Sequence, residues 1–376
     1  ARSRNSLISR PGPDQALIEQ AAASLIQARA PLLLVGGGAV AAADPILALA
    51  ERLDSPVLNT VNGKGICPAT HPLAVGGSPS LACLRSALQT ADVVLAIGTE
   101  MAETDYDLLM EGPLPTLQNL IRMDIDPEQL RIPARPAMGI TTDAGLGATA
   151  LLTALVDTAP AQDSSAENTR GALAGAHRAA TLRTAIEHEP HFHSEIQDFL
   201  CALQRAAPDA ILVGDSTRPT YYAAWQYECL QPRSYFHSVS GFGTLGYALP
   251  AAFGAALGTK RPVVGLIGDG GIQFTLPELT TGSELQLGVP IIIWHNDGYR
   301  EIENSMRAKN IAADSTRILA PDFQAAALAH HVNYANPQSL GDLEQVIGEA
   351  IGVDKPTLVE VRESDFLSQP SGGWYR

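Results

Sequence analysis

Eight short apolar runs, separated by stretches long enough for a helix, constrain the fold of this chain more than any other feature. The runs consist mainly of aliphatic side chains, and several are followed directly by glycine. Strands that are apolar throughout are buried on both faces, which is typical of a parallel sheet covered by helices. We therefore predict an α/β protein with two doubly wound, mainly parallel sheets. The predicted strands are residues 31–35, 56–60, 91–97 and 120–125 in the first sheet and 210–213, 262–267, 289–294 and 357–361 in the second.

The length and the local composition divide the chain into two domains. A chain of 376 residues exceeds the size of one ordinary domain. Residues 156–193 are rich in Ala, Ser, Thr and charged side chains and hold few large apolar residues, so we predict an interdomain linker that is partly helical. The predicted domains are residues 14–155 and 194–376, and residues 1–13 form a leading linker.

The charge balance excludes some classes of partner. With 25 basic and 40 acidic side chains the net charge is −15, which offers no positive surface for the phosphates of DNA or RNA. No apolar run is long enough to cross a bilayer. The four cysteines show no C-x-x-C spacing. We expect a cytoplasmic protein that binds neither nucleic acid nor membranes.

Two turns rich in glycine end consecutive predicted strands of the second sheet. Asp269 follows one strand, and Asn296 follows the next strand 27 positions later. In a right-handed β-α-β unit the two residues emerge at the same edge of the sheet. Carboxylate and amide oxygens suit Mg²⁺ or Ca²⁺ with phosphates and water in the remaining positions, and the amides of Gly270 and Gly271 would face the same phosphates. The pattern predicts a metal-bridged diphosphate site, although a lone Gly-Asp-Gly after a strand is more often a structural turn.

This spacing resembles the thiamine diphosphate signature of the acetolactate synthase and pyruvate decarboxylase superfamily. The resemblance implies that Asp269, the side chain of Asn296 and the backbone carbonyl of Gly298 hold Mg²⁺, which bridges to thiamine diphosphate. Residues 241–250 are similar to the family segment in which a bulky residue, here Leu245, supports the folded cofactor. The family's common Gly-Gln-His is absent from residues 214–218, where two hydroxyls replace it as donors to the diphosphate. The implied cofactor contacts are Ser216, Thr217, Gly243, Thr244, Leu245, Gly268, Asp269, Gly270, Gly271, Asn296, Gly298 and Tyr299.

The first half of the chain resembles the Rossmann-like central domain of the same family. The likeness rests on residues 31–39, 63–73, 91–98 and 124–127. Glycines 36–38 also match part of a dinucleotide fingerprint, but Ala41 replaces the third glycine and no acidic ribose partner is evident. The segment after Gly98 lacks the arginine of FAD-binding members, so we expect no FAD. An NAD-dependent dehydrogenase is a remote alternative.

Members of the family carry a further N-terminal domain, whose glutamate hydrogen-bonds the aminopyrimidine ring of the cofactor. This sequence begins at the central domain and without methionine. We therefore expect a truncated form that is inactive alone, with the activating glutamate in the missing domain. A non-catalytic cofactor-binding subunit is the alternative. The resemblance also implies a homodimer or homotetramer for the full-length form.

The implied reaction is the decarboxylation of a small-molecule 2-oxo acid through a C2 ylid and an enamine. Protonation then gives an aldehyde, whereas attack on a second carbonyl gives the product of an acetolactate synthase-like carboligase. Residues 98–106, 214–222 and 298–302 look more like the 5-guanidino-2-oxopentanoate (2-ketoarginine) decarboxylase branch. There Glu301 would pair with the substrate guanidinium. The other reading is that Glu301 and Glu303 are solvated helix residues, with Arg300 paired to one of them.

Overall fold

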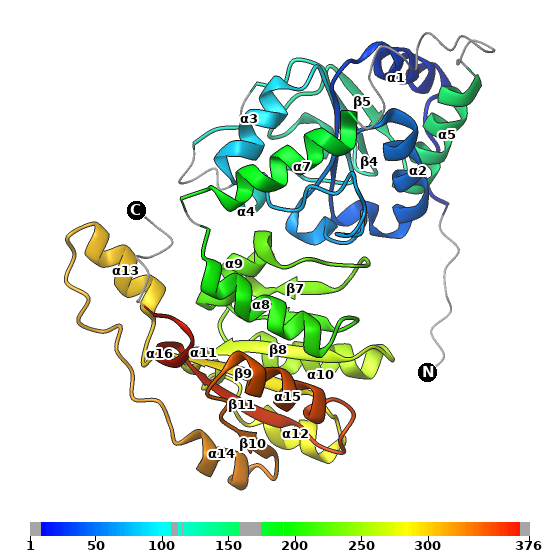
Figure 1. Ribbon diagram of the computed structural model, residues 1–376. Coiled ribbons are helices and arrows are strands. Elements are labelled where there is room, and N and C mark those ends of the chain that lie inside the picture. The colour runs from blue at the N-terminus through cyan, green and yellow to red at the C-terminus, as the bar shows by residue number, and fades with distance from the viewer. Residues whose placement is uncertain (1–8, 107–111, 115, 158–173, 191, 369–376) are drawn as a thin grey trace. The chain divides into compact units, whose positions relative to one another are not determined.

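The computed structural model describes residues 9–106, 112–114, 116–157, 174–190 and 192–368. The chain forms two compact units, Ala1–Glu189 and Pro190–Arg376, and each holds one parallel sheet (Figure 1). The α/β class with two parallel sheets is thereby confirmed. Parts of the two predicted linkers, residues 1–8 and 158–173, lie outside the described residues.

The first unit contains a five-stranded sheet in the order β2-β1-β3-β4-β5. Every residue of the first four strands is buried, as expected for a sheet covered on both faces. The edge strand β5 was not predicted, because of its four residues Ile140 alone is fully buried and the apolar signal is weak. The strands are β1 (Pro31–Val35), β2 (Val57–Asn59), β3 (Val93–Ile97), β4 (Leu120–Asp124) and β5 (Met138–Thr141).

Helices cover both faces of this sheet. Helices α1 (Gln15–Gln27), α2 (Ala43–Leu53) and α5 (Ala144–Asp157) bury their apolar sides against one face. The side chain of Asp14 accepts the N–H of Leu17 at 3.1 Å and so caps α1. The other face carries α3 (Ala82–Thr90) and α7 (Ala174–Glu187), which contact each other (Figure 1). The short helices of the unit are α4 (Glu103–Tyr106) and the 3₁₀ turns Gly37–Ala42, Val61–Gly63 and Gln129–Arg131.

Helix α7 lies in the segment that the sequence analysis assigns to the interdomain linker. Its Gly175 N–H donates to Asp54 Oδ2 at 2.9 Å, and Arg178 donates to the carbonyl of Pro31 at 3.1 Å. Its buried residues are Gly175, Ala179 and Ile186. Because polar contacts and few apolar side chains attach this helix, its composition resembles that of a linker.

Glycines 36–38 pack against the loop after β3, where the strand order of the first sheet reverses. A Cβ at Gly36 would lie 2.4 Å from the carbonyl oxygen of Gly98. The N–H of Gly38 donates to that same oxygen at 2.9 Å. Gly98 itself has a φ of +59°. The close approach of the two backbones accounts for these glycines without a nucleotide.

The second unit contains a six-stranded parallel sheet in the order β10-β11-β9-β8-β6-β7. Strand β6 pairs with both β7 and β8, so the chain reverses direction across the sheet between β6 and β8. Such a reversal opens a ligand crevice at the carboxyl ends of the strands. The two edge strands, β7 and β10, were not predicted because they are short and, unlike β2, not buried throughout. The strands are β6 (Ile211–Gly214), β7 (Tyr235–His237), β8 (Val263–Gly268), β9 (Pro290–His295), β10 (Asn333–Ala335) and β11 (Thr357–Arg362).

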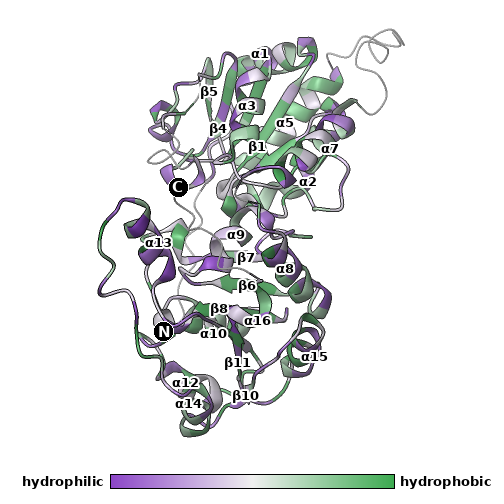
Figure 2. Cartoon of the chain, turned by 60° about the vertical axis from the view of Figure 1, so that its left-hand side comes forward, coloured by the Kyte–Doolittle hydropathy of each residue, from purple (hydrophilic) through white to green (hydrophobic). Residues whose placement is uncertain are grey.

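Helices also cover both faces of the second sheet, and hydrophobic residues gather on the strands (Figure 2). One face carries α8 (Ser194–Ala206), α9 (Arg218–Gln226) and α15 (Leu340–Ala350). The other carries α10 (Ala248–Gly258), α12 (Glu278–Glu284) and α14 (Phe323–Ala329). The remaining helices are the 3₁₀ turn Ser238–Ser240, α11 (Asp269–Ile272), α13 (Arg300–Ala308) and α16 (Glu363–Phe366). Within the described ranges, no helix combines the length and apolarity needed to span a membrane.

Candidate functional site

Three loops meet at the carboxyl edge of the second sheet, and they follow β6, β8 and β9. A Cβ at Gly268 would lie 3.1 Å from Thr217 Oγ1, and one at Gly271 would lie 3.1 Å from a carboxylate oxygen of Asp215. A Cβ at Gly270 would lie 2.6 Å from the ring of Tyr299. Side chains of the neighbouring loops thus lie close against the three glycines at the end of β8 and leave little room for a Cβ there.

Asp269 is buried at the start of α11, with only 1% of its surface exposed. Its Oδ1 accepts the N–H of Gly270 at 2.9 Å, and the backbone N–H groups of Asp297 and Gly298 also face the carboxylate. Its Oδ2 has no hydrogen-bond partner among the described residues. Burial raises the pKa of Asp269 above its usual value, and His295 and the N–H groups offset part of this effect. A buried carboxylate oxygen without a partner among the described residues leaves a place for a water, an ion or another ligand.

Asp215 organises the segment at residues 243–248, and the sequence analysis missed it. It is fully buried; its carboxylate accepts the N–H of Ser216 at 2.8 Å and that of Ala248 at 3.0 Å. The N–H groups of Gly246 and Tyr247 also face it, and burial still raises the pKa of Asp215. Asp215 directly follows an apolar strand, as Asp269 does. That position is the signal that could have revealed it.

The segment at residues 243–246 presents its side chains outward beside this edge. Gly243 and Gly246 adopt positive φ values of +64° and +83°. The hydroxyl of Thr275 donates to the carbonyl of Gly246 at 3.0 Å. Thr244 is exposed and Leu245 is half-buried. Both side chains are thus accessible to a ligand.

Ser216 and Thr217 both lie at this edge, but their hydroxyls are differently engaged. Ser216 Oγ lies 2.8 Å from Ser238 Oγ and donates to the carbonyl of Gly243 at 3.1 Å. Thr217 is buried, and its hydroxyl faces Gly268. Ser216 is half-buried, so a ligand can reach its hydroxyl if the bond to Gly243 opens.

Glu363, which follows β11, holds the side-chain amide of Asn296. Asn296 Nδ2 donates to Glu363 Oε2 at 3.0 Å, and the indole N–H of Trp294 donates to the same oxygen at 2.7 Å. With its nitrogen fixed on Glu363, the amide turns its carbonyl oxygen away from that carboxylate. An amide oxygen in this orientation has the chemistry of a metal ligand. The sequence analysis did not single out Glu363.

Gly298 permits a close approach between the loop after β9 and residues 316–317. A Cβ at Gly298 would lie 2.5 Å from the carbonyl oxygen of Thr316, which also accepts the N–H of Tyr299 at 2.8 Å. A larger residue would therefore shift the backbone at residue 298. The carbonyl of Gly298 is the one that the family resemblance assigns to the metal.

We expect Gly298→Ala to lower the free energy of unfolding by about 1–3 kcal/mol, because the new methyl group clashes with backbone. Gly254→Ala in α10 is the matched control. Nothing lies within 4 Å of a Cβ at Gly254, so that change should raise the free energy of unfolding by about 0.5–1 kcal/mol. Denaturant unfolding measures the stability of both variants. Equal stabilities of Gly298→Ala and Gly254→Ala would contradict the account of Gly298.

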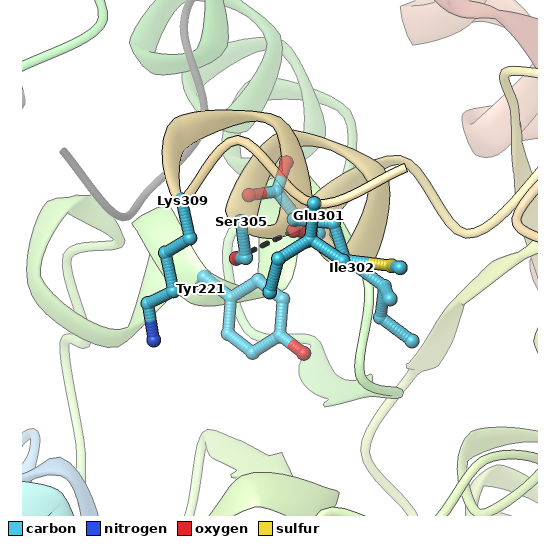
Figure 3. Close-up of a pocket in the computed structure, with 7 residues that line it drawn as sticks. Tyr221, Glu301, Ile302, Ser305 and Lys309 are labelled. Atoms are coloured by element: carbon cyan, nitrogen blue, oxygen red, sulfur yellow. Dashed lines mark hydrogen bonds between the residues drawn. The ribbon is translucent and has the colours of Figure 1, made fainter. Parts of the chain in front are cut away.

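A cavity of about 360 Å³ opens beside the site, between α9 and α13 (Figure 3). Helix α9 follows Thr217 and α13 follows Tyr299, so both walls begin at loops of the site. The hydroxyl of Ser305 donates to the carbonyl of Glu301 at 2.8 Å within the wall formed by α13 (Figure 3). The lining residues are Tyr221, Glu301, Ile302, Ser305, Met306, Lys309 and Ile311.

Glu301 lines this cavity, and its carboxylate is bound by Arg218. Arg218 Nε donates to Glu301 Oε1 at 2.7 Å, and Arg218 Nη1 donates to Glu363 Oε1 at 3.0 Å. Burial lowers the pKa of Arg218, but the two carboxylates more than offset this effect. Arg300 pairs instead with Glu303 at 2.7 Å. Glu301 is therefore not a solvated helix residue; it shares one buried guanidinium with Glu363.

Two sequence models of protein families match the chain. "Thiamine pyrophosphate enzyme, central domain" matches residues 18–155. "Thiamine pyrophosphate enzyme, C-terminal TPP binding domain" matches residues 215–361, the stretch that contains the loops described above. The chain belongs to the thiamine pyrophosphate enzyme family. The resemblance drawn from the Gly-Asp-Gly and Asn-Asp-Gly turns is thus confirmed, thiamine pyrophosphate being another name for thiamine diphosphate.

Individual relatives and a solved structure agree with this family. The chain is 36% identical to a probable 2-ketoarginine decarboxylase of Pseudomonas aeruginosa over 94% of its own length and 62% of the relative. It is 27% identical to the acetolactate synthase isozyme 1 large subunit of Escherichia coli, over 92% of the chain and 60% of the relative. The chain thus spans about six tenths of the length of these family members. Benzoylformate decarboxylase from Polynucleobacter necessarius shares the fold, with a TM-score of 0.71 at 20% identity, over 99% of the chain and 68% of that structure.

The residues at the sheet edge fit a divalent ion and a diphosphate. Asp269 offers a buried oxygen without a partner, and the amide of Asn296 offers a carbonyl oxygen turned away from Glu363. The amide of Gly270 is already bound to Asp269 Oδ1, so it is less available to phosphate than its position suggests. Hard oxygen donors in an incomplete shell are what Mg²⁺ uses when phosphates fill the remaining positions.

Proposed function

We propose that this chain is part of a thiamine diphosphate- and Mg²⁺-dependent decarboxylase of a 2-oxo acid, with 2-ketoarginine as the substrate. The observation that carries the proposal is the unpartnered Oδ2 of Asp269, buried where the strand order reverses. When bound, thiamine diphosphate supplies the carbanion that adds to the substrate carbonyl and accepts electrons as CO₂ leaves.

The chain's own residues would bind and orient the cofactor. In this proposal Asp269, Asn296 and the carbonyl of Gly298 hold Mg²⁺ against the diphosphate. Ser216 and Thr217 lie at the same edge as donors. Further contacts are proposed for Gly243, Thr244, Leu245, Gly268, Gly270, Gly271 and Tyr299.

The cavity between α9 and α13 is the proposed substrate pocket. Glu301 and Glu363 share the single positive charge of Arg218, so the three side chains carry one net negative charge. This charge favours a cationic guanidinium at the Glu301 wall. Lys309 also lines the cavity and offers an ammonium group for a substrate carboxylate. Similarity to the probable 2-ketoarginine decarboxylase supports the same substrate class.

The test compares 2-ketoarginine with pyruvate, using protein expressed from its complete reading frame. We expect CO₂ release and a guanidino aldehyde from 2-ketoarginine, both dependent on thiamine diphosphate and Mg²⁺. Acetolactate formed from pyruvate, with no reaction of 2-ketoarginine, would instead identify a carboligase. Cofactor binding without any turnover would favour a non-catalytic subunit. Light scattering of the same sample tests a proposed homodimer or homotetramer.

Glu301→Gln separates recognition of the guanidinium from general damage to the site. Gln keeps an acceptor for Arg218 but removes the charge, so we expect kcat/KM for 2-ketoarginine to fall by at least about 10-fold, mainly through KM. The matched control is Glu284→Gln, an exposed residue at the end of α12, which should leave kcat/KM unchanged. An unaltered KM in Glu301→Gln would argue against this substrate contact.

A further inference from the structure

His295 lies beside Asp269, and its two ring nitrogens face different carboxylates. Its Nδ1 lies 2.7 Å from Glu360 Oε1. Its Nε2 lies 3.1 Å from Asp297 Oδ1 and 3.9 Å from Asp269 Oδ2. Asp269 and His295 are buried, whereas the side chain of Asp297 is 72% exposed. The three ligand atoms lie within 4.8 Å of one another.

The surroundings of Glu360 decide which nitrogen of His295 carries the proton. Glu360 Oε2 accepts the hydroxyl of Tyr334 at 2.6 Å, and Arg362 lies 2.8 Å from Oε1. With these donors around it, Glu360 Oε1 can accept from Nδ1, and metal binding at Nε2 uses the tautomer of His295 in which Nδ1–H donates to Glu360. The lone pair of Nε2 then points toward Asp297 and Asp269, where three acceptor atoms face one another. Such a group is stable when a cation or an extra proton lies among them.

The spacing of these atoms suits a metal ion. Metal bonds of about 2.0–2.2 Å place two ligand atoms about 3.0 Å apart in an octahedron and about 3.4 Å apart in a tetrahedron. The 3.1 Å separation of His295 and Asp297 meets this requirement, and the 3.9 Å separation of His295 and Asp269 needs a small rotation. A histidine that ligates a metal commonly donates its other ring N–H to a carboxylate, and Nδ1 of His295 lies 2.7 Å from such a carboxylate, that of Glu360.

We propose that Asp269 Oδ2, His295 Nε2 and Asp297 Oδ1 bind a transition-metal dication such as Mn²⁺ or Co²⁺ in the absence of cofactor, with Glu360 as a positioning residue. The site shares Asp269 with the proposed cofactor site but replaces the all-oxygen ligand set with one that includes an imidazole. An imidazole ligand favours Co²⁺ over Mn²⁺, and both over Mg²⁺. The exposed side of Asp297 leaves coordination positions open to water or phosphate.

Mn²⁺ alone, titrated into the cofactor-free chain and followed by electron paramagnetic resonance, tests this site. We expect bound Mn²⁺ with nitrogen modulation of its electron spin echo, which is direct evidence for an imidazole ligand. His295→Gln should remove the modulation and weaken Mn²⁺ binding by at least about 10-fold. Glu360→Gln, which does not touch the ion, should weaken binding by about 10–100-fold. His330→Gln is the matched control, because His330 bonds Thr280 elsewhere in the unit, and it should change nothing.

Three results would overturn the inference: no Mn²⁺ bound, Mn²⁺ bound without nitrogen modulation, or modulation that survives His295→Gln. Circular dichroism checks the fold of each variant. If His295→Gln does not fold, Mn²⁺ binding by Glu360→Gln and Asp297→Asn serves as the test. Normal Mn²⁺ binding by both variants would also overturn the inference. Calorimetry with thiamine diphosphate and Mg²⁺ on the same chain tests the proposed function separately, so the two can fail independently.

Discussion

Asp269→Asn is expected to weaken the joint binding of thiamine diphosphate and Mg²⁺ by at least about 100-fold, because it removes the one buried charge that faces the ion. The same change should not damage the fold. Asn keeps an acceptor for the Gly270 N–H and relieves the burial of a carboxylate oxygen without a partner. We therefore expect the free energy of unfolding of the metal-free chain to rise by about 1 kcal/mol. Calorimetry measures the binding of cofactor and metal, and denaturant unfolding measures the stability.

The opposite directions of these two effects distinguish a ligand from a structural residue. Asp198→Asn is the control, since Asp198 is exposed on α8 and should alter neither binding nor stability. A variant of Asp269 that binds the cofactor normally, or that unfolds more easily than the wild type, would contradict the role given to this carboxylate.

Arg218→Met is expected to lower the free energy of unfolding by about 3–5 kcal/mol, which is the usual cost of removing one partner from a buried ion pair. The side chain of Arg218 is 2% exposed, and it pairs with two carboxylates that are themselves mostly buried. The loss should also weaken cofactor binding, because Glu363 orients the amide of Asn296. Denaturant unfolding and calorimetry report the two effects.

Arg205→Met provides the comparison for Arg218. Arg205 pairs with Glu344 at 2.6 Å on the surface, where solvent screens the pair, so its loss should barely change stability. If the two variants were equally stable, the buried network of Arg218 would have no special role in the fold.

The parallel sheets were predictable because their central strands are apolar throughout. The same reasoning located Asp269 and Asn296, since both directly follow such strands and the right-handed crossover brings them to one edge. Strands β5, β7 and β10 could not be found in this way, because these edge strands are short and only partly buried. Helix α7 could not be told apart from a linker, because its sequence holds few large apolar residues and polar contacts with Asp54 and Pro31 help to hold it.

The supporting residues of the site were harder to predict, because they depend on the order of strands in the sheet. Glu363 and Glu360 lie at the end of β11, which pairs with β9 although it comes last along the chain. No pattern in the sequence shows that pairing, so the partners of Asn296 and His295 stayed hidden. Glu301 lines a cavity, while its pairing with a substrate guanidinium stays a prediction, and its bond to Arg218 depends on the way α9 and α13 pack.

A crystal structure of the chain grown with Mn²⁺ and thiamine diphosphate, with anomalous data that locate the metal, tests the central claim most directly. We expect the metal peak at the carboxyl ends of β8 and β9, bonded to the carboxylate of Asp269 and to the cofactor diphosphate. A diphosphate bound away from this edge, or a metal without any bond to Asp269, would contradict the account.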